Sequence, residues 1–324
     1  MTQTRKVRWL IAHQPIKLFL RTANAFKEKI AELTNGKFDV EIFTATQYAE
    51  QYGTMHRDRG GKGTDPMSSM DDGNLEMSQL HITELGKHHN PDFFALELPF
   101  LFRDHDHASR VLEGPIGKKM LADLVDTSPA KGLAFTYSGG FRCIVSENKI
   151  NTIKELCGVT FATTANPVAI DIVESIGCIP KTFDLSDFSK IGRGQEGYEA
   201  SALETTIPRY LAQFSNSNKK YMLNTKHNLF LTSIIIQTKF WESLTDDEQF
   251  AFQTASLYAS RLERKWSVQE AEEFAAKTDH TDIGVTYAEL PAEETTKFKH
   301  ATKAVYNKYQ NFFYPGLING IIES

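Results

Sequence analysis

Histidines and carboxylates are the first residues whose types and spacing suggest chemistry, because both are metal ligands. Residues 104–107 read Asp-His-Asp-His, and His88 and His89 are adjacent in a polar stretch before Pro91. The two aspartates also suit the N-cap of a helix that begins here, which is the interpretation we favour. The histidine pair is typical of a solvated turn. We therefore predict no metal site at either position.

Motifs for catalysis give no better candidate. The sequence contains no G-x-S-x-G elbow, no H-E-x-x-H pair and no dinucleotide fingerprint after an expected strand. Gly61-Lys62 resembles the end of a phosphate loop, but the first glycine of that motif would fall at His56. Ser138 and the two glycines after it resemble an oxyanion turn, without a base at a recognisable spacing. We predict that the chain is not an enzyme and needs no cofactor.

Composition and charge exclude further classes of partner. Among 324 residues there are 36 Lys and Arg against 41 Asp and Glu, which gives a net charge of −5. Nucleic-acid binding requires clustered positive charge, so we predict no nucleic-acid partner. The longest apolar run, residues 230–236, is much shorter than the ~20 residues of a membrane span.

The compartment is left open by the sequence. Cys143, Cys157 and Cys178 are an odd number without C-x-x-C spacing, which predicts free or buried thiols rather than disulfides or a zinc site. The strand-like residues 7–12 follow Met1 closely, with no secretory signal before them. Either a signal was removed from the chain or the protein stays inside the cell.

The apolar pattern alternates between strand and helix periodicity, which is typical of an α/β protein. Residues 7–12 and 38–43 are expected strands, and residues 16–34 between them are an expected amphipathic helix, so together they predict a right-handed βαβ unit. The polar, glycine-rich residues 52–66 predict an exposed loop. Further strands are expected at 132–138, 159–163, 221–224 and 229–237, and further helices at 107–125, 167–176 and 201–213.

Residues 245–278 predict an unusually long helix. Thr245 and Glu248 form a capping box, and the next 30 residues contain neither Gly nor Pro. At 1.5 Å per residue this helix would be about 50 Å long, which exceeds the width of one domain. We expect it to run across two domains.

His13 and His81 each follow a strand-like segment. Because the carboxyl ends of strands border the ligand site in open α/β sheets, each is a candidate pocket residue, with a buried core histidine as the alternative. His227, at the start of the expected strand 229–237, has the same two interpretations.

Several short strings resemble the DctP-type solute-binding proteins of TRAP (tripartite ATP-independent periplasmic) transporters. The resemblance extends over about residues 6–310. Its strings are Gly73-Asn-Leu-Glu-Met77, Leu98-Pro-Phe-Leu-Phe-Arg-Asp104, Ser138-Gly-Gly-Phe-Arg142, Ala202-Leu-Glu-Thr-Thr206 and Trp241-Glu-Ser-Leu-Thr245.

This resemblance implies an α/β, two-lobed periplasmic-binding-protein-like fold, each lobe a β-sheet flanked by helices and a long helix spanning both lobes. Lobe I would hold residues 1–139 plus about 228–262, and lobe II residues 140–227 plus about 263–324. The lobes would close by a hinge on a small polar organic solute. The protein would be a periplasmic monomer that delivers this solute to the integral membrane subunits of the transporter.

The chain departs from the family pattern at the position that matters most. By resemblance, the arginine that binds a ligand carboxylate falls at Ala162, and an asparagine of the family falls at Thr205. Arg142 and Glu204 match the family. An organic acid is the default ligand, but the loss of the arginine admits a neutral, zwitterionic or amine ligand. A cytoplasmic ligand sensor or a non-transport homologue with the same fold is the alternative function.

Arg142 has two interpretations, as a ligand contact or as the ion-pair partner of Glu204, whose carboxylate would compensate a buried guanidinium. Tyr137 and Phe230 are placed near the ligand by the resemblance. Arg209 and Tyr210 are expected to face solvent or to serve a hinge. The predicted ligand-binding residues are Arg142, Glu204, His81, Tyr137, Thr205, His13, Ala162 and Phe230.

Overall fold

The computed structural model describes residues 4–13, 16–52, 65–184, 187–214 and 217–324. The chain divides into two compact units. Unit 1 comprises Met1–Asn90, Ser109–Tyr137 and Leu231–Trp266, and unit 2 comprises Pro91–Ala108, Ser138–Phe230 and Ser267–Ser324. The lobe boundaries given above stay a prediction. Residues 91–108, which were expected in lobe I, group with unit 2, where Glu97 bonds to Arg142 and Asn166.

Unit 1 is built around the strand order β2-β1-β3-β9-β4. Its elements are β1 (Arg5–Ile11), α1 (Ile16–Leu33), β2 (Phe38–Thr44), α2 (Ala45–Tyr52), α3 (Pro66–Asp71), β3 (Met77–His81), α4 (Ile82–His88), α6 (Pro115–Asp123), the 3-10 helix η2 (Leu124–Asp126) and α10 (Thr238–Glu242). Four elements have residues in both units: α5 (His105–Glu113), β4 (Ala130–Ser146), β9 (Leu229–Gln237) and α11 (Asp246–Ala275).

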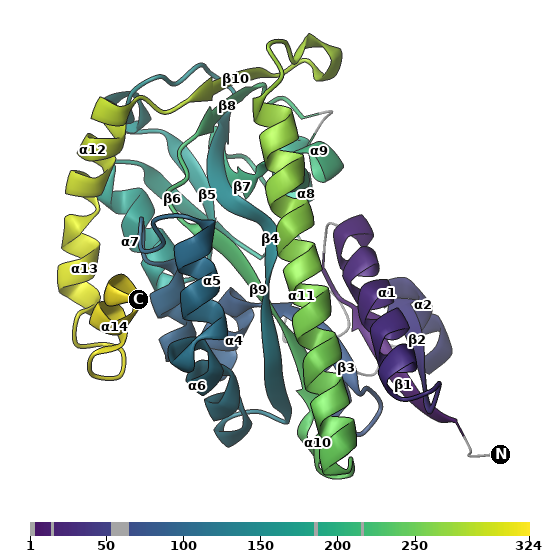
Figure 1. Ribbon diagram of the computed structural model, residues 1–324. Helices are drawn as coiled ribbons and strands as arrows, with labels where there is room; N and C mark the ends of the chain where they lie inside the picture. The colour runs from purple at the N-terminus through teal and green to yellow at the C-terminus, as the bar shows by residue number, and fades with distance from the viewer. Residues whose placement is uncertain (1–3, 14–15, 53–64, 185–186, 215–216) are drawn as a thin grey trace. The chain divides into compact units, whose positions relative to one another are not determined.

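The βαβ unit predicted at the N-terminus is present as β1, α1 and β2. The two strands are parallel, with Val7 opposite Val40, and α1 and α2 lie beside them (Figure 1). β3 also pairs with β1 in parallel, whereas β9 pairs with β3 in the antiparallel sense.

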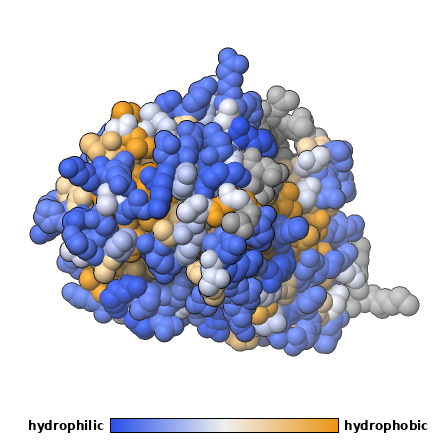
Figure 2. Space-filling model, turned by 90° about the horizontal axis from the view of Figure 1, so that it is seen from above, coloured by the Kyte–Doolittle hydropathy of each residue, from blue (hydrophilic) through white to orange (hydrophobic). Residues whose placement is uncertain are grey.

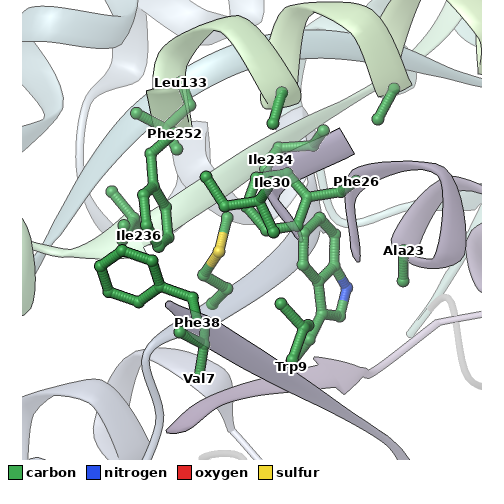
Figure 3. Close-up of a cluster of buried hydrophobic side chains, with 14 of the residues drawn as sticks. Val7, Trp9, Ala23, Phe26, Ile30, Phe38, Leu133, Ile234, Ile236 and Phe252 are labelled. Atoms are coloured by element: carbon green, nitrogen blue, oxygen red, sulfur yellow. The ribbon is translucent and has the colours of Figure 1, made fainter. Parts of the chain in front are cut away.

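An apolar cluster fills the space between α1, α11 and this sheet. Figure 3 shows Trp9 beside Phe26, and Phe252 of α11 beside Phe38. The ring centroids of Trp9 and Phe26 lie 5.1 Å apart, and those of Phe38 and Phe252 lie 4.9 Å apart. Trp9 and Phe26 have no solvent exposure, so burial of apolar area stabilises this layer.

Unit 2 has the strand order β4-β7-β5-β6, with β8 paired to β4 and β10 paired to β8. β7 runs antiparallel to β4 and parallel to β5. The elements are the 3-10 helices η1 (Pro91–Glu97), η3 (Ile153–Leu156) and η5 (Thr281–Ile283), the strands β5 (Thr160–Thr164), β6 (Ile179–Phe183), β7 (Ala202–Thr206), β8 (Tyr221–Asn224) and β10 (Thr286–Glu289), and the helices α7 (Pro167–Ser175), α8 (Phe188–Gly192), α9 (Ile207–Gln213), α12 (Ala292–Ala301), α13 (Lys303–Tyr309) and α14 (Leu317–Glu323).

Two helix predictions were wrong in their boundaries. Residues 201–213 form strand β7 followed by helix α9, because β-branched Thr205 and Thr206 favour a strand and Pro208 lies in the first turn of the helix, which begins at Ile207. Residues 107–125 contain two helices, α5 and α6. Between them lies Gly114, which is so close to the last turn of α5 that an added Cβ would lie 2.3 Å from the carbonyl oxygen of Arg110.

The long helix is confirmed as α11. Its capping box is formed, since Thr245 donates its backbone N–H to Glu248 at 2.9 Å and Glu248 donates its own to Thr245 Oγ1 at 3.3 Å. The helix continues without interruption from residues of unit 1 to residues of unit 2. Gly61-Lys62 and most of the predicted loop 52–66 lie outside the described residues.

The surface in the view of Figure 2 is mainly hydrophilic, with apolar side chains in small scattered patches. Among the described residues, no helix is both long and apolar enough to cross a bilayer. The three cysteines are free thiols, as predicted: Cys143 and Cys178 are buried and Cys157 is exposed. Burial raises the pKa of the Cys143 thiol to about 12, so it behaves as a small apolar side chain.

Candidate functional site

The strand register of unit 2 separates the predicted site residues onto two faces of the sheet. Arg142 lies opposite Thr206, Cys143 opposite Thr205 and Ile144 opposite Glu204. Because successive side chains of a strand point to opposite faces, Arg142 and Glu204 share one face, and Thr205 lies on the other. We refer to these as the ionic face and the apolar face.

On the ionic face, Arg142 lies between two buried carboxylates. Its Nη1 donates to Glu204 Oε1 at 3.2 Å, and its Nη2 donates to Glu97 Oε1 at 3.4 Å. The three side chains are at most 5% exposed. The ion pair with Glu204 was one of the two interpretations of Arg142, and the structure contains it. Sequence reasoning missed Glu97.

Glu97 is positioned by the end of η1 and by two asparagines. Asn166 donates its side-chain amide to Glu97 Oε2. Asn166 is also the N-cap of α7 and accepts the N–H of Val168 at 2.9 Å. Asn228 donates its amide to the backbone carbonyl of Glu97 at 3.3 Å. The Asn-Pro pair at 166–167 was the one sequence signal for this arrangement, since it marks the start of a helix.

Glu204 is held by His227 as well as by Arg142. His227 Nε2 lies 3.0 Å from Glu204 Oε2, and its Nδ1 lies 2.6 Å from the hydroxyl of Thr225. A carboxylate only accepts hydrogen bonds, so Nε2 carries the proton in this contact. Burial alone would raise the pKa of Glu204, but the charge of Arg142 and the bond from His227 outweigh burial and lower the pKa.

A second arginine, Arg209, shares an aromatic ring with Arg142. The guanidinium carbons of Arg142 and Arg209 lie 3.8 and 4.6 Å from the ring centroid of Phe230. Arg209 is 3% exposed, which contradicts the expectation that it faces solvent. Its Nη1 donates to Ser138 Oγ at 3.0 Å. Burial and the like charge of Arg142 lower the pKa of Arg209 to about 9.

Two glycines bring Ser138 to this position. Gly139 and Gly140 have φ of 95° and 88°, in the region that favours glycine. A Cβ at Gly139 would lie 2.1 Å from Thr206 Oγ1, and Thr206 donates that hydroxyl to the Ser138 carbonyl at 2.8 Å. The Ser-Gly-Gly string therefore lets β4 approach the start of α9 closely, which is a structural reason for its presence.

Some polar atoms near this cluster are buried without a hydrogen-bond partner in the described part of the chain. They include Arg142 Nε and Asn228 Oδ1. Buried polar atoms are normally satisfied, so each such exception calls for an explanation. The cluster combines donors, acceptors and an aromatic face, which suits a small polar organic molecule and needs no metal. Within the described ranges, no group of three or more His, Cys, Asp or Glu side chains is arranged to hold a metal ion.

The apolar face holds Ala162 and Thr205. Ala162 has no solvent exposure and belongs to an apolar cluster with Cys143, Leu203 and Tyr210. It lies opposite Leu203 of β7. Thr205 is 1% exposed, and its hydroxyl is buried without a partner among the described residues. That these two residues contact a ligand stays a prediction, although their side chains point away from the ionic face.

The remaining predicted residues belong to unit 1. His13 follows β1 and His81 ends β3, and their ring centroids lie 4.4 Å apart because the two strands are parallel neighbours. Tyr137 is 1% exposed and donates its backbone N–H to the buried Glu263 of α11 at 2.6 Å. Sequence reasoning missed Glu263, because one acidic residue in a charged helix gives no signal of burial. Contact of His13, His81 or Tyr137 with a ligand stays a prediction.

Residues 104–107 have a structural role. The carboxylate of Asp104 accepts the N–H of His107 at 2.7 Å, as expected for an N-cap of α5. His107 Nε2 lies 2.8 Å from the carbonyl oxygen of Ile321, and Arg103 Nη1 donates to that of Ile322 at 2.6 Å. These hydrogen bonds hold the C-terminal helix α14 against residues 103–107.

Comparison with known proteins agrees with this architecture. The family model described as bacterial extracellular solute-binding protein, family 7 (DctP), matches residues 12–311. The C4-dicarboxylate-binding periplasmic protein DctP of Rhodobacter capsulatus is 21% identical over 287 residues, covering 88% of this chain and 80% of the relative.

Solved structures give the same fold. The sugar acid binding protein of Advenella mimigardefordensis in complex with galactonate is 19% identical, with a TM-score of 0.83 over 100% of this chain and 98% of the other. A TRAP periplasmic solute-binding protein of Polaromonas sp. JS666 bound to D-erythronate is 21% identical, with a TM-score of 0.82 over 98% of each chain. The fold is thus the two-lobed α/β fold of these proteins, and the chain belongs to the DctP family of bacterial extracellular solute-binding proteins.

Proposed function

We propose that this chain is the solute-binding component of a TRAP transporter and that it captures a small organic acid. The observation that carries the proposal is the pair of buried guanidinium groups on the ring of Phe230. A guanidinium presents a planar fork of donors that matches a carboxylate, and the match is strongest where water is excluded. Two such groups in one buried cluster suit an anionic ligand.

An organic acid explains the cluster better than an amine does. Both carboxylates of this cluster are already engaged, Glu97 with Arg142 and Asn166, and Glu204 with Arg142 and His227. The names of the compared relatives also refer to acids: C4-dicarboxylates, galactonate and D-erythronate. Residue 162 is an alanine rather than the arginine of the family pattern. Unit 2 nevertheless holds two buried guanidinium groups, those of Arg142 and Arg209.

The rest of the function follows from this role. The protein works in the periplasm, catalyses no reaction, and passes its solute to the integral membrane subunits of the transporter. Ligand binding shifts an equilibrium between conformations of the two lobes, as a ligand selective for one state must do. Within unit 2, solute hydroxyl groups would meet the buried acceptors, including Asn228 Oδ1.

The test is a thermal-shift screen of the full chain with organic acids, amino acids, amines and polyols. A ligand that binds only the native state stabilises it by about 2.7 kcal/mol at a concentration 100 times Kd. We expect acids such as D-erythronate, D-galactonate and C4-dicarboxylates to raise the melting temperature, with isothermal titration calorimetry giving the affinity. Stabilisation by amines or polyols with none by acids would overturn the proposal.

A further inference from the structure

Two of the three cysteines lie together in unit 2, at the end of the sheet where the parallel strands β5 and β6 begin. Cys157 is the C-cap of η3, shortly before β5, and Cys178 directly precedes β6. Gly158, the residue after Cys157, donates its backbone N–H to the carbonyl oxygen of Gly177, the residue before Cys178, at 2.8 Å. Neighbouring strands lie about 4.8 Å apart, and disulfides join Cα atoms about 4.4–6.8 Å apart, so residues beside one such hydrogen bond are within reach of each other.

The side chains of the two cysteines have the same relation. Cys178 donates its thiol to the carbonyl oxygen of Leu156, the residue before Cys157, with a distance of 3.2 Å between Sγ and that oxygen. A Cβ added to Gly177 would lie 3.2 Å from Cys157 Sγ. Each sulfur therefore lies beside the residue that precedes the other cysteine.

The two thiols differ in exposure, and this difference determines the order in which they can react. Cys157 is exposed, whereas Cys178 is 6% exposed. Burial, together with the neighbouring Cys157, raises the pKa of the Cys178 thiol to about 12. Because the thiolate is the reactive form of cysteine, Cys157 should meet an oxidant first and Cys178 should react second.

We propose that Cys157 and Cys178 form an intramolecular disulfide when the protein meets a small oxidising disulfide such as glutathione disulfide. The Cys157 thiolate attacks one sulfur of the reagent, whose S–S bond breaks and releases one glutathione thiolate. Cys178 then gives its proton to solvent and attacks Cys157 Sγ, which forms the bond between the cysteines and releases the second glutathione. The cysteine pair loses two electrons, and these reduce one glutathione disulfide to two glutathione thiols.

The bond would close a ring around a segment that holds part of the ionic cluster. Residues 157–178 include β5 and α7, and Asn166, the N-cap of α7, donates its amide to Glu97 Oε2. A closed ring restricts the unfolded chain and thereby stabilises the native state. The inference goes beyond the proposed function and relies on it only for the location, because the periplasm is an oxidising compartment.

The experiment follows the thiols of the full chain. The reduced protein is incubated with glutathione disulfide at mildly alkaline pH, unfolded, alkylated with iodoacetamide and analysed by intact mass and peptide mapping. We expect the wild type to retain Cys143 as its one reactive thiol, to carry no glutathione and to yield a peptide pair linked through Cys157 and Cys178. Cys143→Ala is the matched control and should form the same bond, because Cys143 is buried and lies outside the pair.

Single variants separate the two steps of the reaction. Cys178→Ala should stop after the first step and keep one glutathione on Cys157. Cys157→Ala should leave Cys178 free under the same conditions. Oxidation should raise the melting temperature of the wild type by about 5 °C, as expected for a ring of about 20 residues, and should leave that of Cys157→Ala unchanged.

Three results would overturn the inference. If the oxidised wild type keeps all three thiols, or keeps glutathione on Cys157 while Cys178 stays free, the two sulfurs do not reach each other. If Cys157 links two chains instead, it is a lone surface thiol. If the bond forms but lowers the melting temperature, the native fold does not hold the pair at bonding distance. Because the measurements use no solute, each of these results leaves the proposed function standing.

Discussion

The two faces of the sheet in unit 2 are equally buried and chemically opposite. On the apolar face, Ala162 packs with Cys143 and Leu203 and needs no partner. On the ionic face, Arg142 is buried only together with Glu97, Glu204 and the groups that hold them. Leu203 and Glu204 are adjacent in β7, and their side chains lie on opposite faces of the sheet.

This difference determines how a substitution on each face affects the stability of the protein. An apolar layer loses free energy in proportion to the area and volume that a substitution alters. The stability of an ionic layer depends on all of its charged side chains, because the removal of one partner leaves an uncompensated charge where water is excluded. Substitutions on the apolar face should therefore change stability alone, and those on the ionic face should change stability and ligand affinity together.

The largest effect is expected for Ala162→Arg. The substitution places a charged side chain in the apolar cluster without a counter-ion, so we expect the free energy of unfolding to fall by more than about 4 kcal/mol. Denaturant unfolding of the ligand-free protein measures this. Ala162→Val is the matched control and should cost about 1–3 kcal/mol, from volume alone.

A contrary outcome for Ala162→Arg has a clear meaning. If the variant folds with unchanged stability and binds carboxylates more tightly than the wild type, residue 162 does border the ligand. The separation of the two faces would then be wrong as a description of the site.

An intermediate effect is expected for Glu204→Gln on the ionic face. The variant keeps the shape of the side chain but removes the charge that offsets Arg142, which should lower the free energy of unfolding by about 2–4 kcal/mol. Calorimetry should show weaker ligand binding as well. Glu196→Gln, at an exposed position of the same unit, should change neither quantity. A Glu204→Gln variant as stable as the wild type would remove the distinction between the faces.

The smallest effect is a dependence of stability on acid pH. The pKa of Glu204 is lower in the folded chain than its ordinary value of 4.5, so the folded state binds fewer protons than the unfolded state in acid. The stabilisation is complete above pH 4.5 and is lost as the pH falls through the folded value. Melting temperatures measured from about pH 6 to pH 3 should fall less steeply in Glu204→Gln than in the wild type. Equal slopes would mean that Glu204 does not contribute.

Much of the fold could be predicted because local patterns determine it. The strand at residues 229–237 coincides with β9, and the capping box of Thr245 and Glu248 marked the start of α11. The segment 201–213 was predicted as one helix, but residues 202–206 form strand β7, which is buried between β4 and β5. Gly114 likewise divided a predicted helix because of a contact within one helical turn.

The site was predicted only in part. Arg142 and Glu204 were chosen because their strings matched a family, and they do form an ion pair. Glu97 was missed because it precedes a hydrophobic motif and nothing in the surrounding sequence indicates a partner 45 residues away. Arg209 was expected to face solvent or to serve a hinge, because an arginine on a helix is usually exposed.

By itself, the sequence determined the α/β class, the long helix and the family, since these depend on periodicity, caps and short strings that are local in the chain. Which face each side chain of unit 2 occupies was decided by the register between strands. The strand pairing buries Ala162 among apolar side chains, and Arg209, which was expected to face solvent or to serve a hinge, is buried against the ring of Phe230. Long-range contacts of this kind connect residues whose separation in the chain carries no local signal.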